Sequence, residues 1–577
     1  MAPSRSRSPA ARSGSRAPTP DRVADRPAPE RRRRHRRSQR PPGGACRGSG
    51  RSHLGRRRGR RLTPRRDAPA RADREVRPRS GGAAERRARV LAAPLRRARR
   101  VRGRARAGRA SSRPRPRARH PGADRRRQTY TFRLRPGIRY SSGRPLRASD
   151  FRRGIERLFR VRSHGVSFYA GLVGAAACER QPGSCDLSRG VAAADGAGTV
   201  AFHLSAPDPD FLYKLTVSGF DAPIPPGTPN RIVAAASVPA TGPYTVAAAG
   251  ERELRLVRNP SFHDWSHAAQ PDGKPDEIVW RYDGSFAEEV RDVEAGRADW
   301  IFGLLAPEQL RRLELRFPGQ LRVKPSFLVE FFPLNTRRPP FDDVRVRRAL
   351  NFAIDRGKIA RMYGGAAVAV PHCQPLTPGM PGYRPYCPYT ARPGASGSWH
   401  APDIARAWEP VVASGTRGER IDVWGTTDGF VPTGVPTYAA SVLRSLGYRT
   451  ELHLVPSTSI SPAQRARFQI SVDGDWLPAY PRPSAYLPQF FGCHGGTSNG
   501  YVCNPRLDHE IRAAGALQLT DAGKAAALWT RIDHEIVDQA YWVTTVNGHG
   551  PEFVSRRLRN YQYSPVGDFI ADQVWLR

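Results

Sequence analysis

One stretch near the middle of the chain, Asn335–Asp355 (NTRRPPFDDVRVRRALNFAID), constrains the fold more than any other. Pro339 and Pro340 fix their own φ and push the residue before each of them out of the helical region, which predicts an extended segment and a turn. Asp342 or Asp343 can then cap a helix and complement its dipole. The apolar residues that follow share one helical face: Val346, Ala349, Leu350, Ala353 and Ile354. The pattern predicts a strand that crosses over into a buried helix, as in α/β domains, with most of the intervening arginines outside the apolar stripe.

The order of residues in NTRRPPFDDVRVRRALNFAIDR also resembles the signature of the family 5 extracellular solute-binding proteins of ABC importers, the dipeptide/oligopeptide-binding class. Two further parts are similar to the same family: TYTFRLRPGIRYSSGRPLRASDF, and TGPY followed by LVRNPSF. The resemblance covers residues 128–577. It implies an α/β fold with two lobes, of the periplasmic-binding-protein type (type II, peptide-binding class).

The first 127 residues have no counterpart in that family. They hold 44 arginines and 8 acidic residues, but no Lys, Phe, Tyr, Trp, Ile or Asn. Such a composition cannot bury enough apolar surface to offset the entropy of ordering the chain, so we expect a disordered Arg-rich segment. Three interpretations stay open: translation of GC-rich DNA upstream or out of frame, a solvated tail, and an arm that binds nucleic acid or another polyanion.

From the residues as they stand we expect no export signal, although a leader would be lost if the arginine-rich segment arose from another start site or reading frame. No apolar run of signal-peptide length follows Met1, and Cys46 lacks the apolar segment that a lipoprotein signal needs. No stretch approaches the ~20 apolar residues of a membrane span. The family resemblance nevertheless implies an extracytoplasmic protein, in the periplasmic space or at the cell surface.

Six of the seven cysteines form three pairs that are close in sequence: Cys178 with Cys185, Cys373 with Cys387, and Cys493 with Cys503. Each pair brackets a loop rich in Pro, Gly, Ser or Asn. Local pairing is the simplest of the 15 connectivities that six cysteines allow, and disulfides indicate an oxidising compartment. Free thiols and metal ligands are the alternatives, although the paired C-x₂-C spacing of a structural zinc site is absent from the sequence.

Beyond residue 128, predicted strands alternate with predicted helices, which favours an α/β architecture. Thr129–Leu134 alternates as a strand, Ser149 is expected to cap a helix, and Ile278–Trp280 has the composition of a buried strand. The helix predicted from Val435 ends at Gly447, a residue suited to a left-handed cap.

The resemblance also implies the domain division. The Arg-rich segment replaces the strands with which the family's first lobe begins, so we expect an incomplete first lobe. The expected divisions are a disordered segment at 1–127, an accessory part of the first lobe at 128–238, the first lobe at 239–338 completed by 553–577, and the second lobe at 339–552.

The predicted ligand stretch is DGDWLPAYPRP, residues 473–483, which follows a predicted strand. Ligands of α/β sheets bind beyond the carboxyl ends of strands, and aromatic side chains there can line a pocket. The alternative is that Trp476 and Tyr480 are core residues. The resemblance implies a pattern of Trp, two residues, Asp and Tyr, in which the Asp pairs with a peptide's α-ammonium. Here Ala479 stands at the Asp position, so a peptide ligand is in doubt. Asp473 or Asp475 is a displaced substitute.

The candidate ligand-binding residues are therefore Trp476, Tyr480, Asp475, Asn335 and Tyr244, the last two taken from the NTRRPP and TGPY motifs. We expect no catalytic residue, cofactor or metal, because motifs such as G-x-S-x-G and H-E-x-x-H are absent from the sequence. The expected function is the substrate-binding component of an ABC importer that captures a peptide or other small solute. Its expected partners are the permease subunits at the membrane, and it is expected to act as a monomer. The alternative function is nucleic-acid or polyanion binding through the arginine-rich arm.

Overall fold

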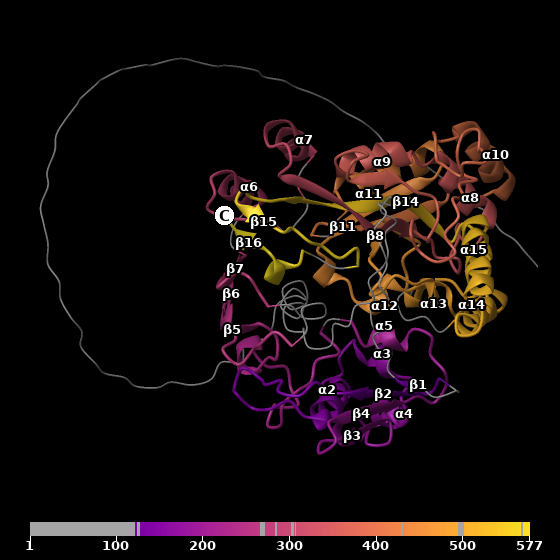
Figure 1. Ribbon diagram of the computed structural model, residues 1–577. Helices are drawn as coiled ribbons and strands as arrows, with labels where there is room; N and C mark the ends of the chain where they lie inside the picture. Colours follow the sequence, from indigo (N-terminus) through magenta and orange to yellow (C-terminus); the bar gives the residue numbers. More distant parts are fainter. Residues whose placement is uncertain are drawn as a thin grey trace, which may run out of the picture. The chain divides into compact units, whose positions relative to one another are not determined.

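The computed structural model describes residues 122–123, 127–217, 219–265, 272–282, 285–301, 305, 307–428, 431–493, 501–566 and 569–577 (Figure 1). The chain divides into two units, Met1–Arg77 and Pro78–Arg577, and every described residue lies in the second. The predictions for the arginine-rich segment and for the missing strands of the first lobe fall outside the described residues.

The first sheet is antiparallel, with the strand order β1-β2-β4-β3. Its strands are β1 (Gly122–Ala123), β2 (Thr129–Arg133), β3 (Val191–Ala194) and β4 (Thr199–His203). Helix α2 (Ala148–Arg160) packs on it through a core that includes Phe151, Phe159 and Phe202. The expectation that Ser149 caps this helix is wrong. The cap is Arg147, whose backbone N–H donates to Asp150, while Ser149 donates its N–H and Oγ–H to Asp195 at 2.8 Å each.

Three short helices follow in the same part of the chain: α3 (Val166–Tyr169), α4 (Ala175–Arg180) and α5 (Phe211–Lys214). Phe211 of α5 contributes to the same core, which anchors this helix beside the first sheet.

A second antiparallel sheet contains β5 (Tyr244–Ala249), β6 (Glu253–Arg258) and β7 (Glu277–Arg281). The prediction that Ile278–Trp280 is buried is wrong, because the strand is half-exposed and Val279 keeps 41% of its surface accessible. Helices α6 (Phe286–Glu294) and α7 (Pro307–Arg316) bury Val290, Val293 and Leu313 in a separate core.

The C-terminal segment returns to this part of the chain. It forms a small sheet of β15 (Leu558–Arg559) and β16 (Trp575–Leu576). The ring of Trp300 stacks on Phe569 with centroids 4.6 Å apart, and Asp299 accepts from Arg557 and Ser555. These contacts support the predicted completion of residues 239–338 by 553–577, although the domain division itself stays a prediction.

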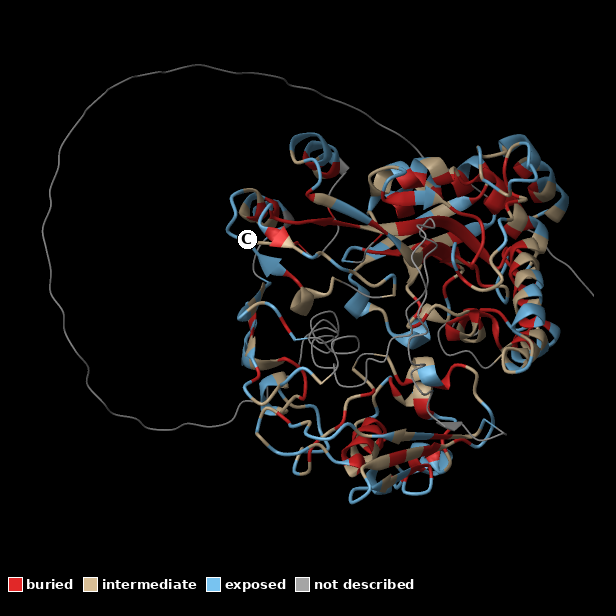
Figure 2. Ribbon diagram, in the orientation of Figure 1, coloured by how far each residue is buried: buried red, intermediate tan, exposed pale blue. Residues whose placement is uncertain are grey.

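Two long strands, β8 (Leu321–Pro333) and β14 (Trp542–Phe553), pair antiparallel and connect two cores. At one end Leu321 and Phe553 contact the core beneath α6 and α7. At the other end Phe332 and Val543 enter the largest core. Strands β13 (Gly474–Trp476) and β9 (Ala369–Pro371) complete the sheet β13-β8-β14-β9, and β14 is buried along most of its length (Figure 2).

The largest core belongs to a parallel sheet in the order β11-β10-β12 and the helices around it. The strands are β10 (Arg420–Thr426), β11 (Arg449–Val455) and β12 (Ile470–Ser471); the helices are α8 (Val344–Ala353), α9 (Arg356–Tyr363), α10 (Ile404–Ser414) and α11 (Gly434–Ser445). The chain turns just after helix α11 at Gly447, whose φ of +93° is the left-handed conformation predicted for the end of this helix. Helices α12 (Pro462–Arg465), α13 (Leu487–Phe491), α14 (Pro505–Leu517) and α15 (Ala522–Asp538) follow, and the last three surround a further core.

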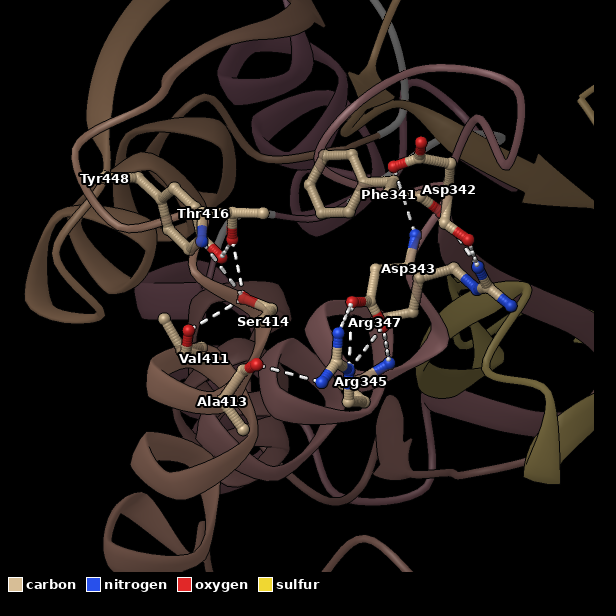
Figure 3. A network of polar contacts seen from close by, with 10 residues as sticks. All are labelled: Phe341, Asp342, Asp343, Arg345, Arg347, Val411, Ala413, Ser414, Thr416 and Tyr448. Atoms are coloured by element: carbon tan, nitrogen blue, oxygen red, sulfur yellow. Dashed lines mark hydrogen bonds and ion pairs between the residues drawn. The ribbon is translucent and has the colours of Figure 1, made fainter.

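Helix α8 confirms the interpretation of the central motif. The Asp343 side chain caps it by accepting from the N–H of Arg345, and the predicted apolar stripe is buried throughout. Figure 3 shows Arg345 bound to Asp343 and to the carbonyl of Ala413 at the end of α10. Arg347 lies outside the stripe and yet is buried, because its guanidinium donates to the carbonyls of Phe341 and Asp342 at 2.8 and 3.0 Å (Figure 3).

The three cysteine pairs are joined as predicted: Cys178–Cys185, Cys373–Cys387 and Cys493–Cys503, with Cα atoms 4.4, 5.3 and 4.4 Å apart. Among the described residues, no helix combines the length and the apolar character needed to cross a bilayer.

Candidate functional site

The predicted ligand stretch begins as a strand on the edge of the long sheet. Strand β13 pairs antiparallel with β8, so that Asp475 lies opposite Glu330 and Trp476 opposite Val329. The ligand stretch is thereby fixed to one of the two strands that connect the cores. Because successive side chains of a strand point to opposite faces, Asp475 and Trp476 project in opposite directions.

Trp476 faces an aromatic cluster. Its ring meets that of Phe490 edge to face, with centroids 5.0 Å apart, and it packs against the core that contains Tyr480 and Trp542. The indole Nε1 is buried and has no hydrogen-bond partner among the described residues. A buried donor without an acceptor is costly, so this N–H is available to a ligand that brings an acceptor.

Asp475 faces the other side, where it meets a buried carboxyl group. Glu330 is 3% exposed, and burial, followed by the charge of Asp475, raises its pKa well above the ordinary value. The Tyr363 hydroxyl hydrogen-bonds to Glu330. The structure therefore places Asp475 with Glu330 and Tyr363, and separates it from Trp476.

Tyr480 is buried at 4% exposure and belongs to the same core as Trp542. Its ring stacks on Tyr213 of helix α5 at 5.7 Å, and the guanidinium of Arg482 lies 5.1 Å from the centre of the Tyr213 ring. The surroundings of Tyr480 are therefore those of a core residue, which was the alternative drawn from the sequence. A contact between Tyr480 and a ligand stays a prediction.

Asp210, immediately before helix α5, is a candidate that the sequence analysis missed. It is 3% exposed, its Oδ2 accepts from the hydroxyl of Ser484, and its Oδ1 is buried without a partner among the described residues. Burial raises its pKa, while the hydrogen bond from Ser484 opposes that shift. Asp210 and Ser484 are 274 residues apart in sequence, and neither lies in a motif that would have linked them.

No acidic side chain occupies the position of Ala479, which is half-buried beside Trp476 and Tyr480. Asp473, one displaced substitute, is engaged by Arg465 at 3.4 Å and by the hydroxyl of Ser471. Asp475, the other, faces Glu330. The acidic groups whose charges act on Tyr480 are instead Asp208 and Asp210.

Asn335 and Tyr244 make local contacts. The amide of Asn335 donates to the carbonyls of Phe468 and Ala466 at 2.8 and 3.4 Å, and its Oδ1 accepts from the N–H of Arg337. These bonds tie the end of β8 to the segment before β12. The Tyr244 hydroxyl, on β5, donates to the carbonyl of Pro275, which precedes β7. The contacts described for these two residues do not join them to Trp476 or Tyr480, and their roles in ligand binding stay predictions.

A hollow of about 290 Å³ is lined by other residues, including Arg322, Arg556 and Arg559. Its lining shares no residue with the ligand stretch. We therefore take the aromatic and acidic groups around residues 473–486 and 208–213 as the candidate site. Aromatic faces, an unpartnered indole N–H and a buried carboxyl group suit the binding of a solute.

Comparison with known proteins identifies the family of the chain. Residues 123–498 match the family described as bacterial extracellular solute-binding proteins, family 5 middle. The probable deoxycholate-binding periplasmic protein YgiS of Escherichia coli (strain K12) is 28% identical over 248 residues, which are 40% of this chain and 43% of that protein. The match thus spans less than half the length of YgiS. The periplasmic oligopeptide-binding protein OppA of the same organism is 23% identical over 432 residues, 71% of this chain and 74% of OppA.

A solved structure, titled clavulanic acid biosynthesis oligopeptide binding protein 2, superposes with a TM-score of 0.67 at 21% identity. The superposition covers 79% of the present chain and 85% of the chain in the solved structure. At this identity the likeness concerns the fold, and it confirms the predicted two-lobed α/β architecture of the binding-protein type.

Proposed function

The chain belongs to the bacterial extracellular solute-binding proteins of family 5, and on this basis we propose that it is the substrate-binding component of an ABC importer. In this role it captures a peptide or other small solute between two lobes and delivers it to a permease. Closure of two lobes around a ligand is a recurrent conformational change in such proteins. Proteins of this family bind substrates for transporters rather than transform them, so the proposed role is not enzymatic.

The observation that carries the proposal is the family match over residues 123–498, which includes both the central motif and the ligand stretch. The arrangement of β8 and β14 supports it, since these two long paired strands connect two separate cores, as expected of a chain with two lobes. The relatives reported above are solute-binding proteins, so they lend no support to the nucleic-acid alternative.

The proposed ligand is a solute that does not depend on an ammonium–carboxylate pair at position 479. Ala479 cannot pair with a charged amine, and burying an unpaired ammonium is costly. Trp476 is proposed to donate its indole N–H to a ligand acceptor, and Asp210 to accept a ligand donor on its free Oδ1. A peptide held through its backbone and side chains, or a non-peptide solute, meets these requirements.

The proposed compartment is outside the cytoplasm. Three disulfides between neighbouring cysteines form and persist in oxidising compartments. The proposed partners are the permease subunits of the transporter, to which the protein is proposed to bind as a monomer.

Calorimetric titration of the full chain tests the proposal. The ligands are short peptides, each offered with a free and with an acetylated amino terminus, and a set of non-peptide solutes. We expect saturable binding of at least one ligand that Trp476→Ala weakens and the matched control Trp408→Ala, on helix α10, leaves unchanged. Binding that both variants retain equally would place the ligand elsewhere, and the absence of binding to any ligand would contradict the proposed role.

A further inference from the structure

Three side chains that are common metal ligands meet on the solvent-side face of the parallel sheet. Asp422 lies on β10, and Glu451 and His453 lie on β11. The parallel register places Asp422 beside Glu451 and Trp424 beside His453. Ile421 and Val423, which alternate with them, are buried in the core. Strand alternation therefore directs the acidic pair and the imidazole to one face.

The ligand atoms of the three residues all lie within 4.8 Å of one another. His453 Nε2 is 3.7 Å from Asp422 Oδ1 and 3.7 Å from Glu451 Oε1. These separations are too long for hydrogen bonds. Zinc binds nitrogen and oxygen at about 2.0–2.2 Å, so that two ligand atoms of a tetrahedral site lie roughly 3.4 Å apart. A small adjustment of the two carboxylates would bring the three atoms to this spacing.

The imidazole ring is held in place, and its Nε2 makes no hydrogen bond to a described residue. Its ring stacks on Trp424 with centroids 4.2 Å apart, and Trp424 stacks in turn on Phe468 at 4.2 Å. Nε2 is shielded from solvent and has no hydrogen-bond partner among the described residues. The stacked ring thus directs a desolvated nitrogen, which makes no hydrogen bond, towards two carboxylates 3.7 Å away.

Arg420 is the resident cation. Its Nε donates to Asp422 Oδ1 at 3.0 Å, and its NH2 group lies 2.5 Å from Glu451 Oε2. The Arg420 side chain is 59% exposed, so it is free to swing away when another cation binds. Glu451 uses different oxygens toward Arg420 and His453, whereas Asp422 Oδ1 faces both. Arg420 therefore competes with a metal for Asp422 Oδ1, whereas Glu451 Oε1 faces the imidazole and is not the oxygen that Arg420 contacts.

We propose that Asp422, Glu451 and His453 form a binding site for a divalent transition-metal cation of the zinc class. One imidazole and two carboxylates are a donor set that Zn²⁺ accepts, with the remaining position open to water. The site goes beyond the proposed solute-binding function, because it involves none of the residues assigned to the solute. It also differs from the sequence-based expectation that the chain holds no metal.

Calorimetric titration of the chelator-treated full chain with ZnCl₂ tests the site. His453→Gln is expected to weaken Zn²⁺ binding by at least about tenfold, since even outer-shell partners of a metal are worth that much. The matched control is His509→Gln, an exposed histidine on α14, which is expected to leave the affinity unchanged. Glu451→Gln is also expected to weaken Zn²⁺ binding, and it leaves the stacking of His453 on Trp424 in place.

Arg420→Gln separates a metal site from a simple ion-pair cluster. Removal of the competing guanidinium is expected to tighten Zn²⁺ binding severalfold, and Co²⁺ in place of Zn²⁺ is expected to give visible absorption bands that His453→Gln abolishes. Equal Zn²⁺ affinity in His453→Gln and His509→Gln, or weaker binding in Arg420→Gln, would overturn the proposal.

Discussion

Tyr213 of helix α5 stacks on Tyr480 of the ligand stretch, with ring centroids 5.7 Å apart. Together with the hydrogen bond from Ser484 to Asp210, this contact joins the part of the chain around the first sheet to the loop that follows β13. Both sides of the contact carry groups that the proposed function uses. We therefore expect the Tyr213–Tyr480 contact to contribute to ligand affinity by holding the loop after β13 in place.

Tyr213→Ala is expected to weaken ligand binding, because it removes the aromatic partner of Tyr480 and the face on which Arg482 rests. Aromatic pairs contribute about 0.5–1.5 kcal/mol beyond their buried area, so the expected loss of affinity is several-fold. Tyr213→Phe keeps the ring and is the matched control. Titration of both variants with the same ligand checks the expectation, which fails if the two variants bind alike.

Ala479→Asp is expected to create a preference for ligands with a free ammonium group. The new carboxylate would stand beside Trp476 and Tyr480, where the resemblance places an ammonium-pairing Asp. The measured quantity is the affinity ratio between a peptide and its amino-terminally acetylated form. We expect this ratio to rise relative to the wild-type chain, and an unchanged ratio would show that position 479 does not face the ligand.

Asp533 is expected to make stability depend on pH near neutrality. Burial raises its pKa from 3.8 to about 7, although Leu376 N–H and the Gln374 amide donate to it. A carboxyl group whose pKa is raised by folding stabilises the fold below its unfolded pKa, and this contribution is lost as the pH rises through the folded pKa. Between pH 4 and 8 the loss is on the order of a few kcal/mol.

Denaturant unfolding of the wild-type chain and of Asp533→Asn, measured from pH 5 to 8, checks this expectation. The variant cannot ionise at this position, so the difference in unfolding free energy between the two proteins should shift in its favour as the pH rises. A difference that stays constant over this range would show that Asp533 titrates normally.

His372 is expected to act in the opposite sense. Burial lowers its pKa from 6.5 to about 4, so the folded state favours the neutral ring. Its contribution is present above the unfolded pKa and is lost as the pH falls through the folded pKa. We expect the wild-type chain to lose stability from pH 6.5 towards pH 4 relative to His372→Gln, as followed by the unfolding free energy. A parallel course of the two proteins would contradict this.

Replacement of Arg356, which begins helix α9 directly after the central stretch, is expected to be strongly destabilising. It is fully buried, and it donates to the carbonyls of Thr544, His372 and Asn351 and to the Asn351 side chain at 2.8–3.2 Å. Arg356→Met leaves these acceptors unpaired and should cost about 3–5 kcal/mol. Arg361→Met, on the same helix but with 69% of its side chain exposed, should change stability by less than about 0.5 kcal/mol. Equal effects of the two substitutions would refute the assignment.

Local sequence signals predicted the elements whose determinants are local. The cap at Asp343, the apolar stripe of α8, the left-handed Gly447 and the three disulfides all follow from residues close together in the chain. The burial of Arg347 and Arg356 could not be predicted from the sequence. An arginine is expected at the surface unless the carbonyl groups that bind its guanidinium are known.

Fewer features of the candidate site than of the fold could be predicted, because residues that are distant in the sequence meet there. The aromatic residues of the ligand stretch were identified from their own neighbourhood, but Asp210 reaches them only through tertiary packing. Asp475 and Trp476 lie on opposite faces because β13 pairs with β8. A strand of only three residues carries too little pattern to predict this pairing from the sequence. Pairing between distant strands is the part of a fold that single-sequence patterns specify least.

Hydrogen exchange of the full chain, measured with and without its best ligand, tests the central claim most directly. Solute binding at the proposed site predicts increased protection in two segments that are distant in sequence, residues 208–217 and 473–486, because both contribute to the contact around Tyr480. Protection confined to other segments, or no change in either of these two, would contradict the claim that they form the solute-binding site.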